Sequence, residues 1–152
     1  EIGVRLVGSE MCIRDSCSAT REGCTLTSEA LEAEHRRRGF RTTGYHYYIR
    51  RDGTVLGTRS LELPGAHCRG HNKYSIGICY EGGLDARGNP KDTRTPEQRS
   101  ALHLLVYQLL QQFRNARVCG HRDLSPDLDG DGTVEPWEWV KQCPCFEVSK
   151  EF

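Results

Sequence analysis

The sequence predicts an α/β fold: a single domain with a central mixed β-sheet flanked by helices. The chain has 152 residues, which corresponds to one domain by length. Short β-branched and aromatic runs alternate with two segments of helical periodicity, and no internal repeat or second domain is visible. Strands that alternate with long helices are typical of α/β domains.

The first helix is expected after a polar loop that follows residues 16–20. Ser28 can cap its beginning, and Glu29 suits the positive end of the helix dipole. The arginines at 36–38 suit the negative end, and Gly39 marks the stop.

Strand signals follow this helix. Residues 44–50 are aromatic and β-branched, and Asp52-Gly53 predicts a hairpin into residues 54–56. The Gly-rich residues 64–72 indicate a loop. Residues 75–80 indicate a buried strand that ends at Gly82-Gly83.

The second helix has the clearest beginning. Thr95 is expected to cap it, Pro96 suits the first turn, and Gln98 completes a capping box. Apolar residues then recur at helical spacing as a core-facing stripe: Leu102, Leu105, Val106, Leu109, Leu110 and Phe113. Residues 117–119 are expected to form a short strand that delivers His121 to a strand end.

Residues 1–16 fit poorly with the rest of the chain. They have neither steady alternation nor a helical stripe, and Val4, Leu6 and Ile13 could contribute only to a poor strand. We expect a non-native or disordered segment, such as a translated adaptor or vector sequence joined to a truncated gene. The first residue, Glu1, also indicates a lost start. The domain is expected to span 17–148, with a tail at 149–152.

Charge and composition exclude some classes of partner. Twenty-one basic and twenty-one acidic residues cancel, so no overall field favours nucleic acid or an anionic membrane. No apolar run approaches the ~20 residues needed to span a bilayer, and no signal peptide is visible. Eight cysteines allow a secreted disulfide framework, but their irregular spacing favours mostly reduced thiols.

Two soft metal ligands bracket a segment rich in carboxylates. His121 precedes the segment, and the Cys143/Cys145 pair follows it. Imidazole and thiolate suit zinc, whereas clustered carboxylates suit calcium or magnesium. This arrangement predicts a catalytic Zn²⁺ site with a separate calcium-type loop across it.

Residues 127–138 match the twelve-residue calcium loop at every required position. The matching residues are Asp127, Asp129, Asp131, Gly132, Thr133, Val134 and Glu138. The segment resembles an EF-hand or dockerin loop; the alternative is an acidic surface turn. We expect a structural Ca²⁺ rather than a sensor, because the loop has no partner. A dockerin-type module would need a second copy, which the sequence lacks.

A series of short motifs also runs through the chain in a fixed order. They are Ser18-Ala19-Thr20, Gly44-Tyr45-His46-Tyr47, Arg51-Asp52-Gly53-Thr54, His67 to Gly70, Asn72, Ser75-Ile76-Gly77, Gly82-Gly83, Gly120-His121, and Cys143-Pro144 with Phe146. Together they resemble the zinc-dependent N-acetylmuramoyl-L-alanine amidases, the phage-lysozyme type that shares its fold with peptidoglycan recognition proteins. The resemblance extends from about residue 17 to about residue 148.

The resemblance implies a zinc ion held by two histidines and one thiolate. The second histidine corresponds to His121 and the thiolate to Cys143, whereas Cys145 falls where the family varies. Ser16 stands at the first ligand position, and a hydroxyl is a poor zinc ligand at neutral pH. Either the chain is a natural zinc-less relative, or the junction with a foreign segment removed the histidine. We favour the second explanation, which predicts an impaired enzyme.

The resemblance also assigns roles to four other side chains. Tyr45 matches the tyrosine that contacts the zinc-bound water or the oxyanion, and Lys141 matches a lysine that stabilises transition-state charge. An aromatic strand residue and a surface lysine are the alternatives. His46 and His67 lie in segments that line the cleft of the family, as substrate-binding or structural residues. His46 could also partly substitute as a ligand.

The function implied is hydrolysis of the amide between N-acetylmuramic acid and the first L-alanine of the peptidoglycan stem peptide. A monomeric phage endolysin or bacterial autolysin acting on the cell wall would fit, synthesised in the cytoplasm and released or exported by an N-terminus now lost. The alternative is a non-catalytic peptidoglycan-binding module that keeps the cleft but lacks a ligand.

Overall fold

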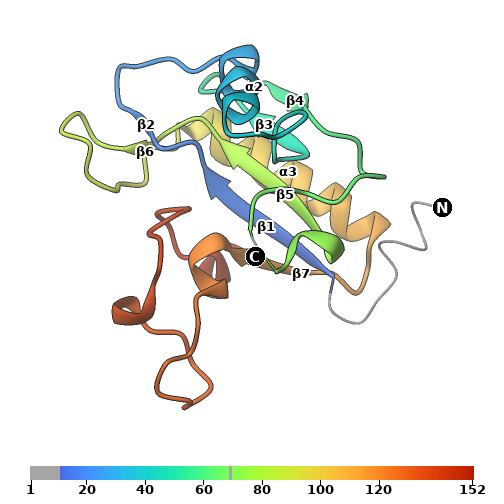
Figure 1. Ribbon diagram of the computed structural model, residues 1–152, viewed down its shortest axis with the longest axis vertical. Helices are drawn as coiled ribbons and strands as arrows, with labels where there is room; N and C mark the ends of the chain where they lie inside the picture. Colours follow the sequence, from blue (N-terminus) through green and yellow to red (C-terminus); the bar gives the residue numbers. More distant parts are fainter. Residues whose placement is uncertain (1–10, 69) are drawn as a thin grey trace.

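The computed structural model describes residues 11–68 and 70–152 (Figure 1). Its centre is a five-stranded sheet in the order β4-β3-β5-β1-β7. The strands are β1 (Cys12–Cys17), β3 (Tyr47–Ile49), β4 (Val55–Gly57), β5 (Ser75–Tyr80) and β7 (Arg117–Gly120). All neighbouring pairs are parallel except β3 and β4, which are antiparallel. The predicted mixed sheet is confirmed.

The described helices α2 (Ser28–Arg37) and α3 (Pro96–Gln112) pack on the sheet. Alternate residues of β5 point to different faces: Ile78 and Tyr80 join the core formed with α3, whereas Cys79 packs with Leu31 of α2. Figure 1 shows α3 running behind β5 and β1. In the described chain, no helix combines the length and apolar character needed to cross a membrane.

Shorter elements complete the fold. A second sheet pairs β2 (Thr20–Arg21) with β6 (Gly83–Leu84). The 3-10 turns in the described part of the chain are η1 (Asn72–Tyr74), η2 (His121–Leu124), η3 (Pro136–Glu138) and η4 (Val148–Lys150). The segment after β7 therefore consists mainly of loops and single turns.

Local signals located most of these elements. The capping box at α3 is present: the Thr95 side chain accepts from Gln98 N, and the Gln98 side chain accepts from Thr95 N. The hairpin between β3 and β4 turns at Gly53, whose φ is +86°. The predicted cap of α2 was wrong by one residue. Thr27, not Ser28, accepts from the Ala30 N–H, so Ser28 is the first helical residue.

The strand β1 is the main difference from the sequence-based expectation. Cys12 to Ser16 belong to the segment expected to be non-native or disordered, yet they form the strand between β5 and β7. Residues 1–10 lie outside the described residues. Whether the segment is native is a separate question, but the folded domain begins at least as early as Met11, which is 2% exposed.

The interior of β1 is polar. Arg14, Asp15 and Ser16 are each at most 1% exposed. Within the described residues, the buried side-chain nitrogen and oxygen atoms without a hydrogen-bond partner belong to these three residues and Arg122. Native proteins hold few such atoms, so their concentration in one strand marks a local conflict between sequence and fold.

The expected tail is tied into the domain. Arg94 is buried over the ring of Phe146, 3.3 Å from its centroid. Its guanidinium pairs with Asp92 and with Glu151, which lies in the predicted tail at 149–152. Val148 joins the α3 core. The folded unit therefore extends to the end of the chain.

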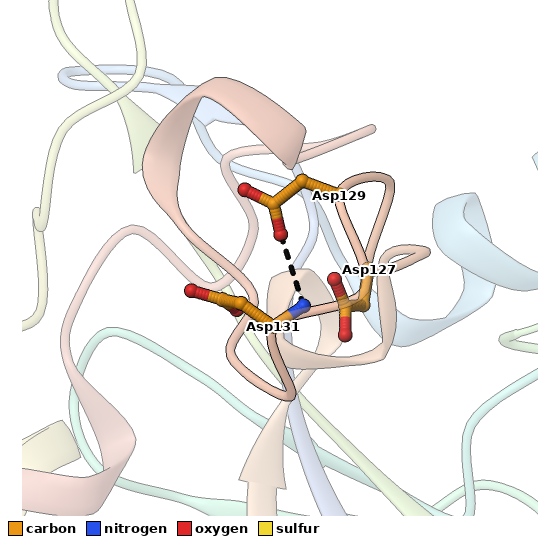
Figure 2. A group of neighbouring side chains, drawn as sticks. All are labelled: Asp127, Asp129 and Asp131. Carbon is orange, nitrogen blue, oxygen red and sulfur yellow. Dashed lines mark hydrogen bonds between the residues drawn. The ribbon is translucent and has the colours of Figure 1, made fainter.

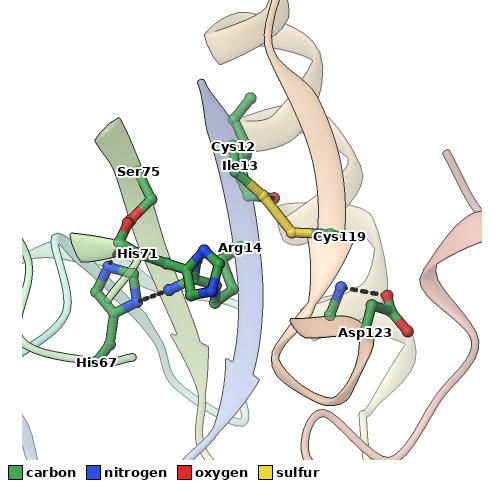
Figure 3. The surroundings of a disulfide bond; sticks show 9 residues. Cys12, Ile13, Arg14, His67, His71, Ser75, Cys119 and Asp123 are labelled. Carbon is green, nitrogen blue, oxygen red and sulfur yellow. Dashed lines mark hydrogen bonds between the residues drawn. A yellow bond between two sulfur atoms is a disulfide. The ribbon is translucent and has the colours of Figure 1, made fainter. Parts of the chain in front are cut away.

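The cysteines are mostly unpaired. One disulfide joins Cys12 of β1 to Cys119 of β7 (Figure 3). The other six, all within the described residues, are not in disulfide bonds: Cys17, Cys24, Cys68, Cys79, Cys143 and Cys145. This distribution agrees with the expectation of mostly reduced thiols.

Candidate active site

The candidate site lies at the carboxyl-terminal edge of β1 and β7. These strands are parallel and Asp15 pairs with Gly120, so the next residues, Ser16 and His121, reach the same edge of the sheet. His121 begins η2 directly after β7. In open α/β sheets, ligands bind beyond the carboxyl ends of the strands.

Cys143 can reach this edge because Gly120 has no side chain. A Cβ atom at Gly120 would lie 2.7 Å from Cδ of Pro144, which is too close for a real contact. The N–H of Arg122 also donates to the carbonyl oxygen of Cys143 at 2.8 Å. These two contacts hold the Cys143-Pro144 segment against the beginning of η2.

His121 and Cys143 are brought together as their resemblance implied. The imidazole of His121 interacts with the sulfur atoms of Cys143 and Cys68. Burial opposes the imidazolium, but both sulfur contacts outweigh it and raise the pKa of His121 to about 9. Hydrogen bonds from Cys17 and His121 hold the pKa of Cys143 well below the usual thiol value, although burial acts in the opposite direction.

Ser16 and Tyr45 complete the inner part of the site. Ser16 is 1% exposed and its Oγ lacks a hydrogen-bond partner. Tyr45 precedes β3, lies beside Ser16 and stacks on the His67 ring at a centroid distance of 5.9 Å. Burial is the main reason that the pKa of Tyr45 is raised well above its usual value. Its hydroxyl is therefore a hydrogen-bond donor at neutral pH.

The donor set does not fit a three-ligand zinc site. His121 and Cys143 are suitable ligands in contact with each other, but the position that the resemblance assigns to the first ligand holds a serine hydroxyl. Among the described residues, the groups of three His, Cys, Asp or Glu side chains with ligand atoms within 4.8 Å of one another consist of carboxylates. Ser16, which the resemblance places at the first ligand position, is buried and carries a hydroxyl in place of an imidazole.

Two neighbouring cavities open at this edge and share His121 and Lys141. The first, of about 320 Å³, is lined by residues of α2 and by Tyr45, His121, Lys141 and Cys143. The second, of about 430 Å³, is lined among others by His67, Cys68, His121 and Lys141. Lys141 is exposed and lies between the two. An extended ligand could thus pass over His121.

His67 lies in the second cavity but is held by its neighbours. Its Nδ1 is 2.9 Å from Nη1 of Arg14, so Nδ1 accepts this hydrogen bond (Figure 3). Burial, reinforced by the charge of Arg14, lowers the pKa of His67 to about 2. Its ring packs on Gly77, where a Cβ atom would lie 2.5 Å from the ring. Gly77 is therefore required for this placement.

His46 occupies a structural position. Its side chain is fully buried, its Nδ1 accepts from the Gly77 N–H at 3.0 Å, and its Nε2 donates to the Leu63 carbonyl at 2.9 Å. Both ring nitrogens are engaged, so in this conformation His46 offers no free nitrogen to a substrate or a metal. The expected roles of His46 in the cleft have no geometric support.

The acidic loop forms two carboxylate groups rather than one. Asp127, Asp129 and Asp131 lie with carboxylate oxygens within 4.8 Å of one another (Figure 2). Asp127 accepts from the N–H groups of Gly130 at 2.7 Å and Gly132 at 2.8 Å. Both glycines have positive φ, as the sharp turn requires.

Glu138 is turned toward the backbone of the loop. It is 3% exposed, and it accepts from the N–H groups of Leu128 at 2.6 Å and Glu135 at 2.9 Å. Its carboxylate groups with Asp129 and Glu135 rather than with all three aspartates. Glu135 was not among the expected ligands. For Glu138 to join Asp127 and Asp131 around one cation, as the calcium-loop pattern requires, its carboxylate would have to turn away from these backbone partners.

Sequence reasoning missed two sulfur neighbours of the site. Cys17 donates its backbone N–H to Sγ of Cys143 at 3.0 Å. Cys68 interacts with His121 and lines the second cavity. Cys17 directly follows the first ligand position and Cys68 directly follows His67, so their places in the motifs were the available signal. Nothing in the spacing predicted the contacts.

Comparison with known proteins agrees with this geometry. The family model for N-acetylmuramoyl-L-alanine amidase matches residues 16–144. The endolysin of Enterobacteria phage K11 is 34% identical over 134 residues, covering 88% of this chain and 80% of the endolysin. A peptidoglycan-recognition protein of Drosophila melanogaster is 32% identical over 98 residues, covering 64% of this chain and 53% of that protein.

A solved structure shares the fold. The N-acetylmuramoyl-L-alanine amidase LysC from Clostridium intestinale URNW superposes with a TM-score of 0.71 at 24% identity, covering 94% of this chain and 81% of LysC. The fold and the edge site define an α/β protein of the amidase and peptidoglycan-recognition type. The chain belongs to the N-acetylmuramoyl-L-alanine amidase family.

Proposed function

We propose that this domain is a peptidoglycan amidase that hydrolyses the amide between N-acetylmuramic acid and L-alanine, and that Ser16 impairs it. The observation that carries the proposal is the contact between His121 and Cys143 beside Tyr45 and Lys141, at one edge of the sheet. Family membership and the endolysin relative support the reaction class.

The proposed metal ligands are His121, Cys143 and a histidine at position 16 in place of Ser16. A zinc ion in such a site supplies a water of lowered pKa and polarises a carbonyl group. The present chain has only two of these proposed ligands, because position 16 is a serine. This deficit is the physical reason for the proposed impairment.

The remaining groups are placed to bind and polarise an amide. Lys141 lies at the boundary of the two cavities, where its ammonium can stabilise negative charge on the substrate carbonyl oxygen. The Tyr45 hydroxyl, protonated because burial raises its pKa, can donate a hydrogen bond to the same oxygen. His67 is proposed to line the part of the cleft that receives the substrate. The protein is proposed to act on peptidoglycan as a monomer.

The second candidate is a non-catalytic module that binds peptidoglycan. Ser16 favours it, because a cleft can be kept while a metal ligand is lost. The Drosophila melanogaster relative, named as a peptidoglycan-recognition protein, is consistent with such a use of the fold. The retained His121, Cys143, Tyr45 and Lys141 favour an enzyme.

The deciding experiment compares this chain with Ser16→His and with the matched variant Ser16→Ala. We expect stoichiometric zinc and release of L-alanine-linked peptides from muropeptides only with histidine. Adding Cys143→Ser to Ser16→His should remove both. If no variant cleaves but all bind muropeptides, the recognition module is correct. Cleavage by the unaltered chain would contradict the proposed impairment.

We further propose that residues 127–138 bind a structural Ca²⁺ through Asp127, Asp129, Asp131, Glu138 and the carbonyl of Thr133. The clustered carboxylates and the two positive-φ glycines support this assignment. Calcium should raise the thermal midpoint of the parent but not of Glu138→Gln. Glu62→Gln, which removes the same charge from an exposed loop, should behave like the parent. If calcium leaves the thermal midpoints of the parent and of Glu138→Gln equally unchanged, the loop is a simple turn.

A further inference from the structure

Three thiols meet beside the candidate site. The N–H of Cys17 lies 3.0 Å from Sγ of Cys143, and the Cys17 side chain also hydrogen-bonds to Cys143 and Cys145. Cys17 therefore lies between the two cysteines of the Cys143-Pro144-Cys145 segment. Such contacts between free thiols, from segments distant in the sequence, are not needed for the amide hydrolysis proposed above.

Cys17 is held in this position by the second sheet. A Cβ atom at Gly83 would lie 2.5 Å from Sγ of Cys17, so the sulfur packs directly on the backbone of β6. Cys145 donates from its thiol to the Gly83 carbonyl at 3.4 Å. The thiol of Cys145 is thus turned toward β6, whereas Cys143 and Cys17 both line the 320 Å³ cavity.

We propose that Cys17 and Cys143 form a redox-active pair, in which a hydroperoxide oxidises Cys143 and Cys17 resolves the product as a Cys17–Cys143 disulfide. A small oxidant that enters the cavity can reach the sulfur of Cys143, which lines it. Cys17 is the thiol within immediate reach of that sulfur.

The chemistry balances in two steps. The Cys143 thiolate attacks hydrogen peroxide, the O–O bond breaks, and Cys143 becomes a sulfenic acid while hydroxide leaves and takes up a proton as water. The Cys17 sulfur then attacks the sulfenic sulfur, the S–O bond breaks, and a second water leaves with the thiol proton. The peptide loses two electrons in total, and hydrogen peroxide accepts them.

The disulfide would withdraw the Cys143 sulfur from metal binding. This consequence rests on the proposed function, because it needs Cys143 to be a zinc ligand. The disulfide itself does not, since it requires only two neighbouring thiols and an oxidant. The two ideas can therefore fail separately.

The test uses the full chain, reduced with dithiothreitol, freed of reductant and metal, and titrated with hydrogen peroxide. Alkylation, proteolysis and mass spectrometry should find a cross-linked peptide pair containing Cys17 and Cys143, which dithiothreitol separates. In Cys17→Ser, and equally in Cys17→Ala, the cross-link should be absent, and dimedone should trap sulfenic acid at Cys143. Cys24→Ser, at an exposed free cysteine, is the matched control and should cross-link like the parent.

Two results would overturn the proposal: a cross-link from Cys17 to Cys145 instead, or sulfinic acid at Cys143 beside a free Cys17 in the parent. Zinc separates the two ideas in the Ser16→His chain. Zinc at about 100 times its Kd should slow cross-linking about a hundredfold, because only the metal-free fraction reacts. If zinc does not slow the cross-linking, Cys143 is not a zinc ligand, but the proposed disulfide still stands. If the Ser16→His chain binds zinc but the metal-free protein forms no cross-link, the disulfide proposal is wrong and the assignment of Cys143 as a zinc ligand still stands.

Discussion

Arg14 donates from Nη1 to Nδ1 of His67 across 2.9 Å inside the protein, between strand β1 and the loop before η1 (Figure 3). The guanidinium is fully buried, and its Nε and Nη2 have no hydrogen-bond partner. One contact to a neutral imidazole does not compensate for the desolvation of a cation. The hydrogen bond thus joins Arg14, which has unpartnered buried nitrogens, to His67, which lines the candidate cleft.

Replacing Arg14 should stabilise the protein. We expect Arg14→Met to raise the free energy of unfolding by about 1–3 kcal/mol, because an apolar side chain of similar length removes the buried charge. Urea unfolding measures the change. Arg41→Met, on an exposed arginine of similar length, should change stability by less than about 0.5 kcal/mol. A destabilised Arg14→Met would mean that the contact with His67 outweighs burial.

The pH dependence of stability should report Asp15. Burial raises its pKa in the folded state well above the ordinary 3.8. A raised carboxyl pKa gives stability that is fully present below 3.8 and is lost as the pH rises through the folded-state value. The parent should therefore lose stability with rising pH relative to Asp15→Asn, by about 2 kcal/mol or more at pH 7. Urea unfolding from pH 4 to pH 8 tests this, and parallel curves for the two proteins would contradict it.

The two histidines of the cleft should differ in charge. With its pKa at about 2, His67 should stay neutral between pH 5 and pH 8, whereas the metal-free His121, with its pKa at about 9, should stay protonated. Nitrogen-15 NMR of the imidazole rings distinguishes these states. In Arg14→Met, the pKa of His67 should rise, since a neighbouring positive charge is removed. A transition of His67 near pH 6.5 in the parent would refute the description of its surroundings.

Lys141 should affect turnover more than binding. In the Ser16→His chain, Lys141→Met should lower kcat about 10²–10³-fold with a small change in KM, because its charge is needed mainly in the transition state. Steady-state hydrolysis of a muropeptide gives both parameters. Lys150→Met, at an exposed lysine of η4, should leave kcat within twofold of the Ser16→His chain, an estimate of about 0.4 kcal/mol. A selective rise of KM in Lys141→Met would assign the lysine to ground-state binding.

Gln98 should be important for stability beyond its capping role. Its buried amide donates to the carbonyls of Glu81 at 2.9 Å and Ile49 at 3.2 Å, so it ties α3 to the ends of β5 and β3. Gln98→Leu should lower the free energy of unfolding by about 2–4 kcal/mol, because it leaves buried backbone groups unpaired. Gln108→Leu, on the exposed face of α3, should be nearly neutral in the same urea assay. Equal losses would show that the carbonyls find other partners.

Features encoded within a few residues were predictable. The Thr95–Gln98 box and the turn at Gly53 need only neighbours in sequence, and both are present. The cap of α2 was missed by one position because Thr27 and Ser28 are adjacent and chemically alike. Strand β1 was missed for a different reason. Arg14 and the two polar residues after it erase the apolar pattern, and pairing with β5 and β7 determines this strand.

In the candidate site, too, some features could be predicted from the sequence, whereas others depend on contacts between distant segments. Resemblance placed His121 and Cys143 together, although 21 residues separate them and spacing alone could not do so. The environment of Cys17 depends on Gly83 and on the segment after η3, which approach it only in three dimensions. The engagement of Glu138 with backbone N–H groups likewise depends on the path of the loop without a cation.

The place of β1 between β5 and β7 also has a consequence for synthesis on the ribosome. β1 precedes β5 and β7 in the sequence, yet its residue Cys12 pairs with Ser75 of β5 and with Arg117 of β7. The nascent chain must therefore keep β1 unpaired until most of the domain has emerged. Contacts of such high sequence separation form slowly, and the polar interior of β1 adds little local preference to hold it. The strand that holds the unpartnered buried polar side chains is therefore also a strand that stays unpaired during much of synthesis.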